Sequence, residues 1–174
     1  MKKNFKRHVV IQPADQSIRL IPLTQGQNAI VDAADFEWLN QWNWFAYWSI
    51  AGKTFYARRC NRAEGVKLMH REILKITGNV QVDHRNHNTL DNRKLNLRPA
   101  TKSQNAANKI GRTRLISPYK GVTLIPRCST RKWRAKIQWL GKMYHIGVFP
   151  TPEEAHEAYK IKAKELHGEF ASFT

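Results

Sequence analysis

The chain has 174 residues, of which 30 are Lys or Arg and 13 are Asp or Glu, so its formal net charge is +17. That excess is typical of proteins that bind a polyanion, most often nucleic acid, although ribosomal and membrane-surface proteins share it. A hydrophobic content of 41% with six Trp indicates a folded protein and excludes a disordered basic tail.

The two cysteines, Cys60 and Cys128, lie far apart in the sequence. They exclude a four-cysteine zinc site and a disulfide framework, and they favour reduced thiols in a cytosolic protein. No apolar run approaches the ~20 residues that span a bilayer, and the basic N-terminus lacks the apolar core of a signal peptide. We therefore expect no membrane partner and a cytoplasmic protein, encoded by a bacterium or a phage.

Residues 1–66 are expected to form a small α+β support. Strands are predicted at 9–11 and 18–23, and a short helix at 32–39, where Asp32 is a plausible N-cap. A hairpin is predicted with its turn at Ala51-Gly52. Five aromatic residues between 42 and 48 could stack unpaired bases, but such a cluster is more often core. Arg58, Arg59 and Arg62 could reach phosphates.

The central segment predicts a helix at 67–75, a strand at 80–82, a loop rich in Asn and Asp, a strand at 95–98 and a helix from Thr101 to about Lys109. Thr101 and Gln104 have the spacing of a capping box. The two strands and the loop carry Asp83, His84 and Asn96, and the last helix carries Asn105. A carboxylate, an imidazole and two carboxamides can hold one hard cation and one general base, which predicts metal-assisted cleavage of a phosphodiester.

Residues 67–109 resemble the HNH endonucleases, a ββα-metal fold. The resemblance rests on Met69-His70-Arg71-Glu72-Ile73, Asp83-His84, Asn88, Asp91-Asn92, Asn96-Leu97-Arg98 and Gln104-Asn105. It implies that Asp83 and Asn105 bind Mg²⁺ or another divalent cation such as Mn²⁺, and that His84 is the general base, titrating near neutral pH. It also implies that Asn96 braces the loop and orients the imidazole, that His70 and Arg85 are possible accessory residues, and that the products carry 5′-phosphate and 3′-hydroxyl ends.

Other interpretations of the same residues are open. The loop could be rich in turns, with polar groups that only satisfy backbone, and His70 could cap or pack inside a helix. His87 stands where relatives usually have Gly, which predicts a change in the loop's shape. The pair His84 and His87 is compatible with zinc, but no further nitrogen or sulfur ligand is nearby, so no zinc is expected.

The C-terminal third predicts three strands, at 119–125, 133–139 and 142–149, followed by a helix at 152–166 with one apolar stripe. Residues 117–149 contain seven Lys or Arg and no acid, whereas residues 150–174 contain five Glu and three Lys. The sheet is therefore expected to face the polyanion, with the helix behind it. Strand alternation predicts that Trp133, Ala135, Ile137, Tyr144 and Ile146 point to the helix, and that Arg134, Lys136, Gln138, Met143 and His145 point outward.

Residues 117–173 resemble the plant APETALA-two/ethylene-response-factor DNA-binding domain, over YKGV, KWRAKI, the Gly-Val-Phe turn, TPEEAHEAY and HGEFASF. In that family a three-stranded sheet lies in the major groove, a known way for strands to read DNA. The resemblance implies DNA contacts by eight residues: Lys120, Thr123, Arg127, Arg134, Lys136, Gln138, Lys142 and His145. Thr123, Lys136 and Gln138 depart from the family's usual residues, so the plant target sequence does not carry over. A basic sheet that binds RNA or an acidic protein is the other interpretation.

The predicted fold class is α+β: a ββα-metal core with a small N-terminal support, plus a three-stranded antiparallel sheet packed on one helix. The predicted divisions are a support (1–66), an HNH nuclease module (67–110), a basic linker (111–116) and a DNA-binding domain (117–174). The predicted function is that of a site-specific or semi-specific endonuclease of double-stranded DNA, of the homing, phage or mobile-element kind. It would act as a monomer or dimer without a small-molecule cofactor. The alternatives are a non-catalytic DNA-binding regulator with a relic nuclease module, and an RNA-binding protein.

Overall fold

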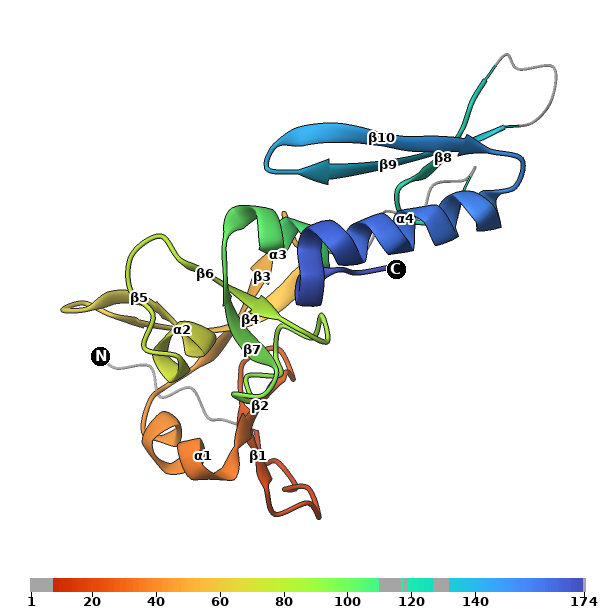
Figure 1. The fold of residues 1–174 in the computed structure, drawn as a ribbon. Coiled ribbons are helices and arrows are strands. Elements are labelled where there is room, and N and C mark those ends of the chain that lie inside the picture. The colour runs from red at the N-terminus through yellow and green to blue at the C-terminus, as the bar shows by residue number, and fades with distance from the viewer. Residues whose placement is uncertain (1–7, 110–116, 118, 127–131, 174) are drawn as a thin grey trace. The chain divides into compact units, whose positions relative to one another are not determined.

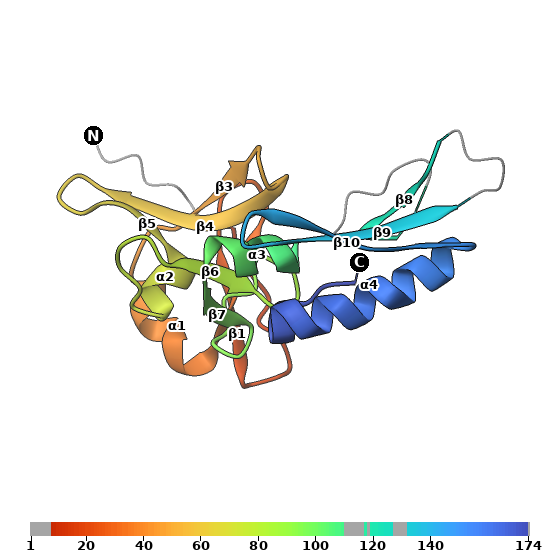
Figure 2. The same ribbon diagram turned by 45° about the horizontal axis from the view of Figure 1, so that its top comes forward.

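The computed structural model describes residues 8–109, 117, 119–126 and 132–173. The chain divides into two compact units, Met1–Pro99 and Ala100–Thr174. Both mix helices with small antiparallel sheets, in agreement with the predicted α+β class. Figure 1 labels the elements in chain order, and Figure 2 turns the same ribbon.

The first unit begins with a two-stranded sheet and a helix. Strand β1 (Ile18–Pro22) pairs antiparallel with β2 (Asn28–Asp32), and α1 (Ala33–Asn40) follows at once. The predictions for β1 and α1 are confirmed, whereas β2 was missed. The strand predicted at 9–11 is wrong: these residues form no strand, and Val9 and Ile11 are 95% and 92% exposed, so apolar character alone was misleading.

A three-stranded sheet in the order β3-β4-β5 completes the support. Strand β3 (Phe45–Ser49) and strand β4 (Thr54–Asn61) form the predicted hairpin, whose turn contains Ala51-Gly52. Strand β5 (Gly65–Leu68) pairs with the end of β4 and takes up Lys67, so helix α2 (Met69–Ile73) is shorter than the predicted 67–75. Backbone pairing with β4 outweighs the local helical pattern there.

One apolar cluster joins these elements. The aromatic residues between 42 and 48 divide: Trp44 is 3% exposed and belongs to the core, while Tyr47 and Trp48 are 42% and 46% exposed. The aromatic group therefore supplies both core and surface. The buried members of the apolar cluster are Ile21, Leu23, Ala29, Val31, Leu39, Trp44, Ala46, Ala57, Met69, Ile73 and Leu97.

The central segment follows the predicted order of strand, loop, strand and helix. Strand β6 (Gln81–His84) pairs with β7 (Leu97–Ala100), two residues later than the predicted 95–98, and α3 (Lys102–Asn108) follows. The predicted capping box at Thr101 is confirmed, because its hydroxyl accepts from the Gln104 N–H and the Gln104 carboxamide accepts from the Thr101 N–H.

In the second unit, a three-stranded antiparallel sheet in the order β10-β9-β8 is covered on one face by a helix, as both ribbon views show. Strands β9 (Trp133–Trp139) and β10 (Lys142–Phe149) have the predicted bounds, β8 (Val122–Leu124) is shorter, and helix α4 (Pro152–His167) runs one residue further than predicted. The short 3-10 helix η1 (Gly168–Phe170) lies against α3.

Small residues let α4 approach the sheet closely. Ala135, Ala155 and Ala163 are fully buried. Gly121 has φ +75°, and a Cβ there would lie 2.3 Å from the Tyr159 ring and 2.8 Å from the Lys136 carbonyl oxygen. A side chain at 121 is therefore excluded both by space and by the left-handed backbone.

The alternation predicted for this sheet is confirmed on β9, where Ala135 and Ile137 are buried while Arg134 and Gln138 are exposed. On β10, Tyr144 pairs with the buried Ile137 and so lies on the predicted helix-facing side, although it is 36% exposed near the turn of the hairpin. Ile146 does pack against the helix-side core. An irregularity between His145 and Gly147 interrupts the alternation of the strand at that point.

Candidate active site

Asp83 and His84 end strand β6 and are both buried, at 4% and 5% exposure. Successive side chains on a strand point to opposite faces, so the two neighbours have different surroundings. Asp83 meets Arg98 of the adjacent strand β7, whereas His84 lies among the rings of Tyr56 and His70. The strand end therefore places a carboxylate and an imidazole side by side in separate environments.

The Asp83–Arg98 pair is buried on both sides, with side-chain exposures of 4% and 6%. Arg98 Nε and Nη2 each lie 2.7 Å from Asp83 Oδ2. Removing one partner of such a pair leaves an uncompensated buried charge, which is strongly destabilising. Arg98 therefore holds the candidate metal ligand in place. The sequence analysis included Arg98 in a motif but gave it no role.

His84 is enclosed by aromatic rings from two other elements. Its ring centroid lies 5.2 Å from that of His70 on α2 and 6.2 Å from that of Tyr56 on β4, and Tyr56 and His70 are 5.6 Å apart. All three pairs meet edge to face, an arrangement that aromatic rings favour. The orientation of the candidate base is thus fixed by packing from β4 and α2, and His70 is positioned beside it.

Burial controls the protonation of this cluster. It lowers the pKa of His84 to about 4, although an interaction with the Asn92 side chain and the charges of Asp83 and Asp91 act in the opposite direction. Burial also lowers the pKa of His70 to about 3, with help from the nearby His84 and Arg71. Burial, followed by the charge of Asp83, raises the pKa of the Tyr56 phenol. The pKa of His84 in the free protein is therefore below the neutral value expected from sequence, and its imidazole is uncharged at neutral pH.

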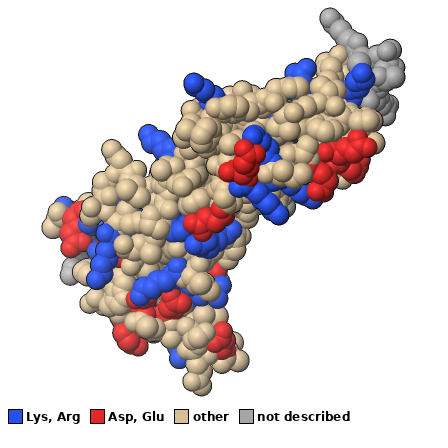
Figure 3. Space-filling model, viewed as in Figure 1, with Lys and Arg blue, Asp and Glu red and all other residues tan. Residues whose placement is uncertain are grey.

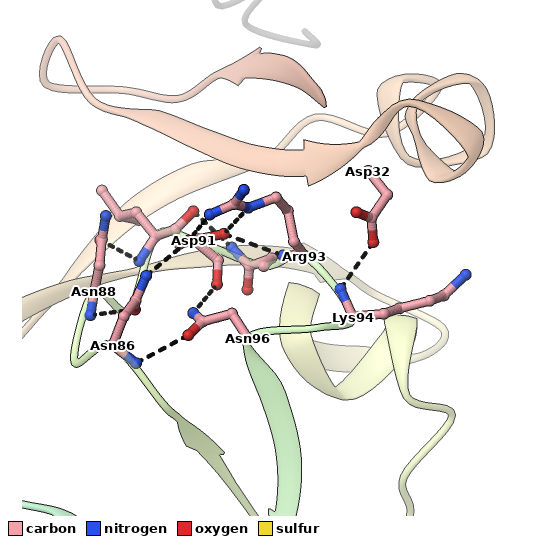
Figure 4. Close-up of polar contacts among 9 residues, drawn as sticks. Asp32, Asn86, Asn88, Asp91, Arg93, Lys94 and Asn96 are labelled. Atoms are coloured by element: carbon pink, nitrogen blue, oxygen red, sulfur yellow. Dashed lines mark hydrogen bonds and ion pairs between the residues drawn. The ribbon is translucent and has the colours of Figure 1, made fainter. Parts of the chain in front are cut away.

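The loop between β6 and β7 is built around Asp91, which is 1% exposed (Figure 4). Its carboxylate accepts hydrogen bonds from Asn86 Nδ2 at 2.8 Å, from Arg93 Nε at 2.8 Å and from Arg93 Nη2 at 2.6 Å. Although burial acts to raise the pKa of Asp91, the bonds from Arg93 and Asn86 lower it. The Asn- and Asp-rich composition therefore produces an ordered loop that is partly buried.

Asn96 makes hydrogen bonds to two points of this loop, and the bracing role that the resemblance implies stays a prediction. Its Oδ1 accepts from the Asn86 backbone N–H at 2.9 Å, and its Nδ2 donates to the Asp91 carbonyl at 2.7 Å (Figure 4). Another carboxamide of the loop, Asn92, is 1% exposed and acts to raise the pKa of His84 through a side-chain hydrogen bond. The proposed orienting role therefore has a second candidate, Asn92, which sequence reasoning missed.

The N-terminal support holds the loop from the other side. The backbone of Ile30 in β2 exchanges hydrogen bonds with the loop, donating to Leu90 O at 2.8 Å and accepting from Asn92 N at 2.7 Å. Lys94 donates its backbone N–H to Asp32 at 2.8 Å and its ammonium lies 2.8 Å from Asp35 Oδ2 (Figure 4 shows the Asp32 contact). The support is thus part of the scaffold that shapes the site.

The comparisons with known proteins bear on this geometry. Residues 75–107 match the HNH endonuclease family model. The HNH segment, as we call these residues, contains β6, the loop, β7 and most of α3. The chain is also 40% identical over 98 residues to an uncharacterized HNH endonuclease of Acanthamoeba polyphaga mimivirus, a match that covers 56% of this chain and 49% of the relative. The chain therefore spans about half the length of that relative, and no solved structure matches.

The remaining predicted residues of the HNH segment have distinct settings. Asn105 lies on α3 and is half-buried, and its backbone N–H bonds to the Thr101 carbonyl. Arg85 is exposed and donates its backbone N–H to Asn96 O at 2.9 Å. His87 has φ +64°, the left-handed region that favours glycine, so a residue with a side chain adopts this conformation in the loop.

The predicted DNA-binding residues of the second unit separate by strand register. Thr123 of β8, Arg134 of β9 and Val148 of β10 form one cross-strand row, and Lys136 lies opposite His145. The next pair on the same face is Gln138 and Met143. We call this side the outer face of the sheet, and it consists of Thr123, Arg134, Lys136, Gln138, Met143, His145 and Val148. The other face is covered by α4, over which acidic and basic side chains are interspersed (Figure 3).

Two predicted DNA contacts, Lys120 and Lys142, are not on the outer face. Lys120 is half-buried and its ammonium donates to the carbonyls of Ala107 and Lys109 at 2.7 and 2.6 Å, so it caps the end of α3, and burial lowers its pKa to about 8. Lys142 lies opposite Trp139, in the row that alternates with the outer face. Arg127 and the predicted linker 111–116 are outside the described residues.

Sequence reasoning also missed Tyr56 and gave Arg98 no role, although both surround the Asp83–His84 pair. Tyr56 had no signal of its own, because its contact with His84 joins residues 28 positions apart. Arg98 could have been found as the only basic residue in the second strand of the segment. No three His, Cys, Asp or Glu side chains gather as metal ligands do within the part of the chain that the structure describes. In the same part, no helix is long and apolar enough to cross a membrane.

Proposed function

We propose that the protein is a divalent-metal-dependent endonuclease that hydrolyses phosphodiester bonds of double-stranded DNA. One observation carries the proposal: a buried, uncharged His84 stands directly beside Asp83 inside a segment that matches the HNH endonuclease family. The net charge of +17 supports a polyanionic substrate. The mimivirus relative, by its name an HNH endonuclease, supports the same class of activity.

The donor set is chemically suited to a hard cation. Magnesium prefers oxygen ligands and keeps several waters, so few protein ligands suffice. Asp83 offers a carboxylate that Arg98 Nε holds at 2.7 Å, and this carboxylate would be one ligand of the cation. Asn105 stays the predicted second ligand. When bound, the cation supplies positive charge that stabilises the scissile phosphate and the leaving oxygen.

His84 accepts the proton of the attacking water. Because its pKa in the free protein is about 4, the imidazole is in the base form at neutral pH. A negatively charged phosphodiester beside the ring favours the protonated form, which raises the pKa when substrate binds. The edge-to-face contacts of Tyr56 and His70 keep the ring in one orientation during this transfer.

The hydrogen bonds of Asn96 and Asp91 keep the loop closed over the end of β6. In the second unit, the outer face of the sheet would select the site that is cut, as the resemblance to the APETALA-two family implies. The expected ends are 5′-phosphate and 3′-hydroxyl. A homing, phage or mobile-element setting belongs to the same proposal.

The test is cleavage of supercoiled plasmid by the purified chain with Mg²⁺, followed by sequencing of the ends from a digested random DNA library. Wild type should nick or cut, and His84→Ala should lower the rate by about 10²–10⁴-fold, the usual contribution of a general base. DNA binding by His84→Ala should be retained, because the imidazole is buried. A wild-type protein that binds DNA but cuts no member of the library would instead identify a non-catalytic regulator.

A further inference from the structure

Two adjacent arginines on β4, Arg58 and Arg59, lie on opposite faces of the β3-β4-β5 sheet, because side chains alternate along a strand. Cross-strand pairing places Lys67 beside Arg59, and Phe45 and Leu68 beside Arg58. The two residues are identical in type and next to each other in sequence, so differences between them come from their surroundings alone.

Arg59 is neutralised by its surroundings. Its Nη2 lies 2.8 Å from Glu72 and 3.0 Å from Glu64, and its guanidinium lies 4.2 Å from the Trp42 ring centre. The residue is only 6% exposed. Two carboxylates and an aromatic ring compensate the charge of Arg59 within the support, although its Nε, like that of Arg58, has no hydrogen-bond partner among the described residues.

Arg58 has no such compensation. Its guanidinium lies 4.7 Å from the ring centre of Tyr47, and within the described residues it makes no ion pair with a carboxylate. Its Nε is buried and has no hydrogen-bond partner in that part of the chain. Partly burying a cation without a counter-charge costs free energy, which indicates a ligand that supplies negative charge.

The position of Arg58 shows where that ligand would be. Arg58 and Tyr56 are two residues apart on β4, hence on the same face and about 7 Å apart along the strand. Tyr56 contacts His84, the candidate base. A spacing of that size equals roughly two nucleotides at 3.4 Å of helix axis for each phosphate of a strand. Tyr47, which is 42% exposed, holds the guanidinium at the surface of the sheet.

We propose that Arg58, held by Tyr47, binds a backbone phosphate of the DNA strand that lies in the candidate active site, close to the phosphate that is cut. This inference rests on the proposed function and adds a substrate-binding residue from the N-terminal support. Arginine suits the task because its planar fork of N–H donors matches phosphate oxygens and because it stacks on aromatic rings. The sequence alone groups Arg58 with Arg59, and their surroundings in the structure distinguish the two.

The experiment compares Arg58→Gln with Lys67→Gln, which removes one positive charge from the opposite face of the same sheet. Binding of a fluorescently labelled DNA duplex is measured by anisotropy in EDTA over a series of salt concentrations. Arg58→Gln should weaken binding about tenfold at low salt and lower the slope of log K against log salt by about 0.9, the value of one phosphate contact. Lys67→Gln should leave the slope unchanged.

Two further pairs make the test specific to the geometry. Arg58→Lys keeps the charge without the fork, so it should recover the slope but only part of the affinity. Tyr47→Phe should bind as wild type does, and Tyr47→Ala should lose affinity, since the ring face is what contacts the guanidinium. Circular dichroism checks that each variant is folded. If Arg58→Gln does not fold, the loss of affinity in Arg58→Lys is measured in its place.

The inference is overturned if Arg58→Gln keeps the wild-type slope, if Lys67→Gln lowers it equally, or if duplex RNA is bound more tightly than DNA with the same dependence on Arg58. Failure of the proposed function has a different signature. If wild type cuts no DNA but Arg58→Gln still lowers the slope, the nuclease proposal fails while the phosphate contact stands. If wild type cuts DNA but Arg58→Gln keeps the wild-type slope, the nuclease proposal stands and the phosphate contact of Arg58 fails.

Discussion

The two units treat their polar residues in opposite ways. In the first unit, Asp83, His84, Asp91 and Asn96 are at most 7% exposed and are held by other side chains. In the second unit, the polar side chains of the outer face, such as Arg134 and Gln138, are exposed and occur on a sheet whose other face carries the core. Buried polar groups are costly unless they are paired, so the first arrangement depends on the hydrogen bonds and ion pairs that these side chains make.

The difference separates two tasks. Groups that carry out chemistry gain from a fixed geometry and from removal of water, which strengthens each electrostatic interaction. Groups that recognise a polyanion must remain accessible, and their contribution comes from charge and reach. Changes in the first unit should therefore affect folding and chemistry, and changes on the outer face should affect binding alone.

The largest effect is expected at Asp91. Replacing Asp91 by Ala removes the acceptor of three side-chain hydrogen bonds and leaves Asn86 and Arg93 without it. We expect the free energy of unfolding to fall by about 3 kcal/mol, at the low end of the cost of breaking a buried ion pair. The low end applies because the Arg93 side chain is 38% exposed and can be solvated by water. Urea unfolding followed by circular dichroism measures it. The control is Asp15→Ala, which removes an exposed carboxylate. An equal loss of stability in this variant would contradict the expected difference between buried and exposed carboxylates.

A second effect concerns pH. Because the pKa of His70 is lowered to about 3, the folded protein binds fewer protons than the unfolded chain between that value and the ordinary 6.5. This contribution to stability is fully present above pH 6.5 and is lost as the pH falls toward 3. The slope from His70 alone is about 1.4 kcal/mol per pH unit.

Replacing His70 by Phe tests this directly, since the ring contacts with Tyr56 and His84 are kept while the titrating group is removed. Stability at pH 7.5 should change little, and the loss of stability below pH 6.5 should become shallower by about one proton. An acid profile that is unchanged in the variant would show that His70 is not buried in solution as the structure places it.

The smallest effect is expected on the outer face. Arg134→Gln should weaken DNA binding about fivefold and leave the unfolding temperature within about 1 °C, as substitutions of exposed residues usually do. The matched control is Lys162→Gln. Lys162 lies on α4, on the other side of the sheet from the outer face, and its ammonium pairs with Glu165. Equal loss of affinity in both variants would show that total charge matters and the outer face does not.

Local signals in the sequence were sufficient for much of this fold. The capping box at Thr101 and the two strands of the β9-β10 hairpin depend on residues within a few positions of each other, and their bounds were predicted correctly. The adjacent pair of Asp83 and His84 was found the same way, because the HNH pattern of the segment is local too.

Features made by distant contacts could not be predicted. Strand β5 exists because residues 65–68 pair with the end of β4, although the local pattern at Lys67 favoured a helix. The ring of Tyr56 reaches His84 only through the folding of β4 beside α2. Lys120 was predicted as a DNA contact from the resemblance to the APETALA-two family, and the structure shows its ammonium bound to the carbonyls of Ala107 and Lys109.

The close approach of α4 to the sheet at Gly121 has a consequence for recognising relatives of the second unit. Because a Cβ at that position would collide with the Tyr159 ring, this spacing of helix and sheet requires glycine there, together with the buried alanines at 135, 155 and 163. The outer-face residues are under no such steric limit and can differ from one target sequence to another. Homologous domains of this architecture should thus be traced by their small buried residues, while their binding preferences diverge freely.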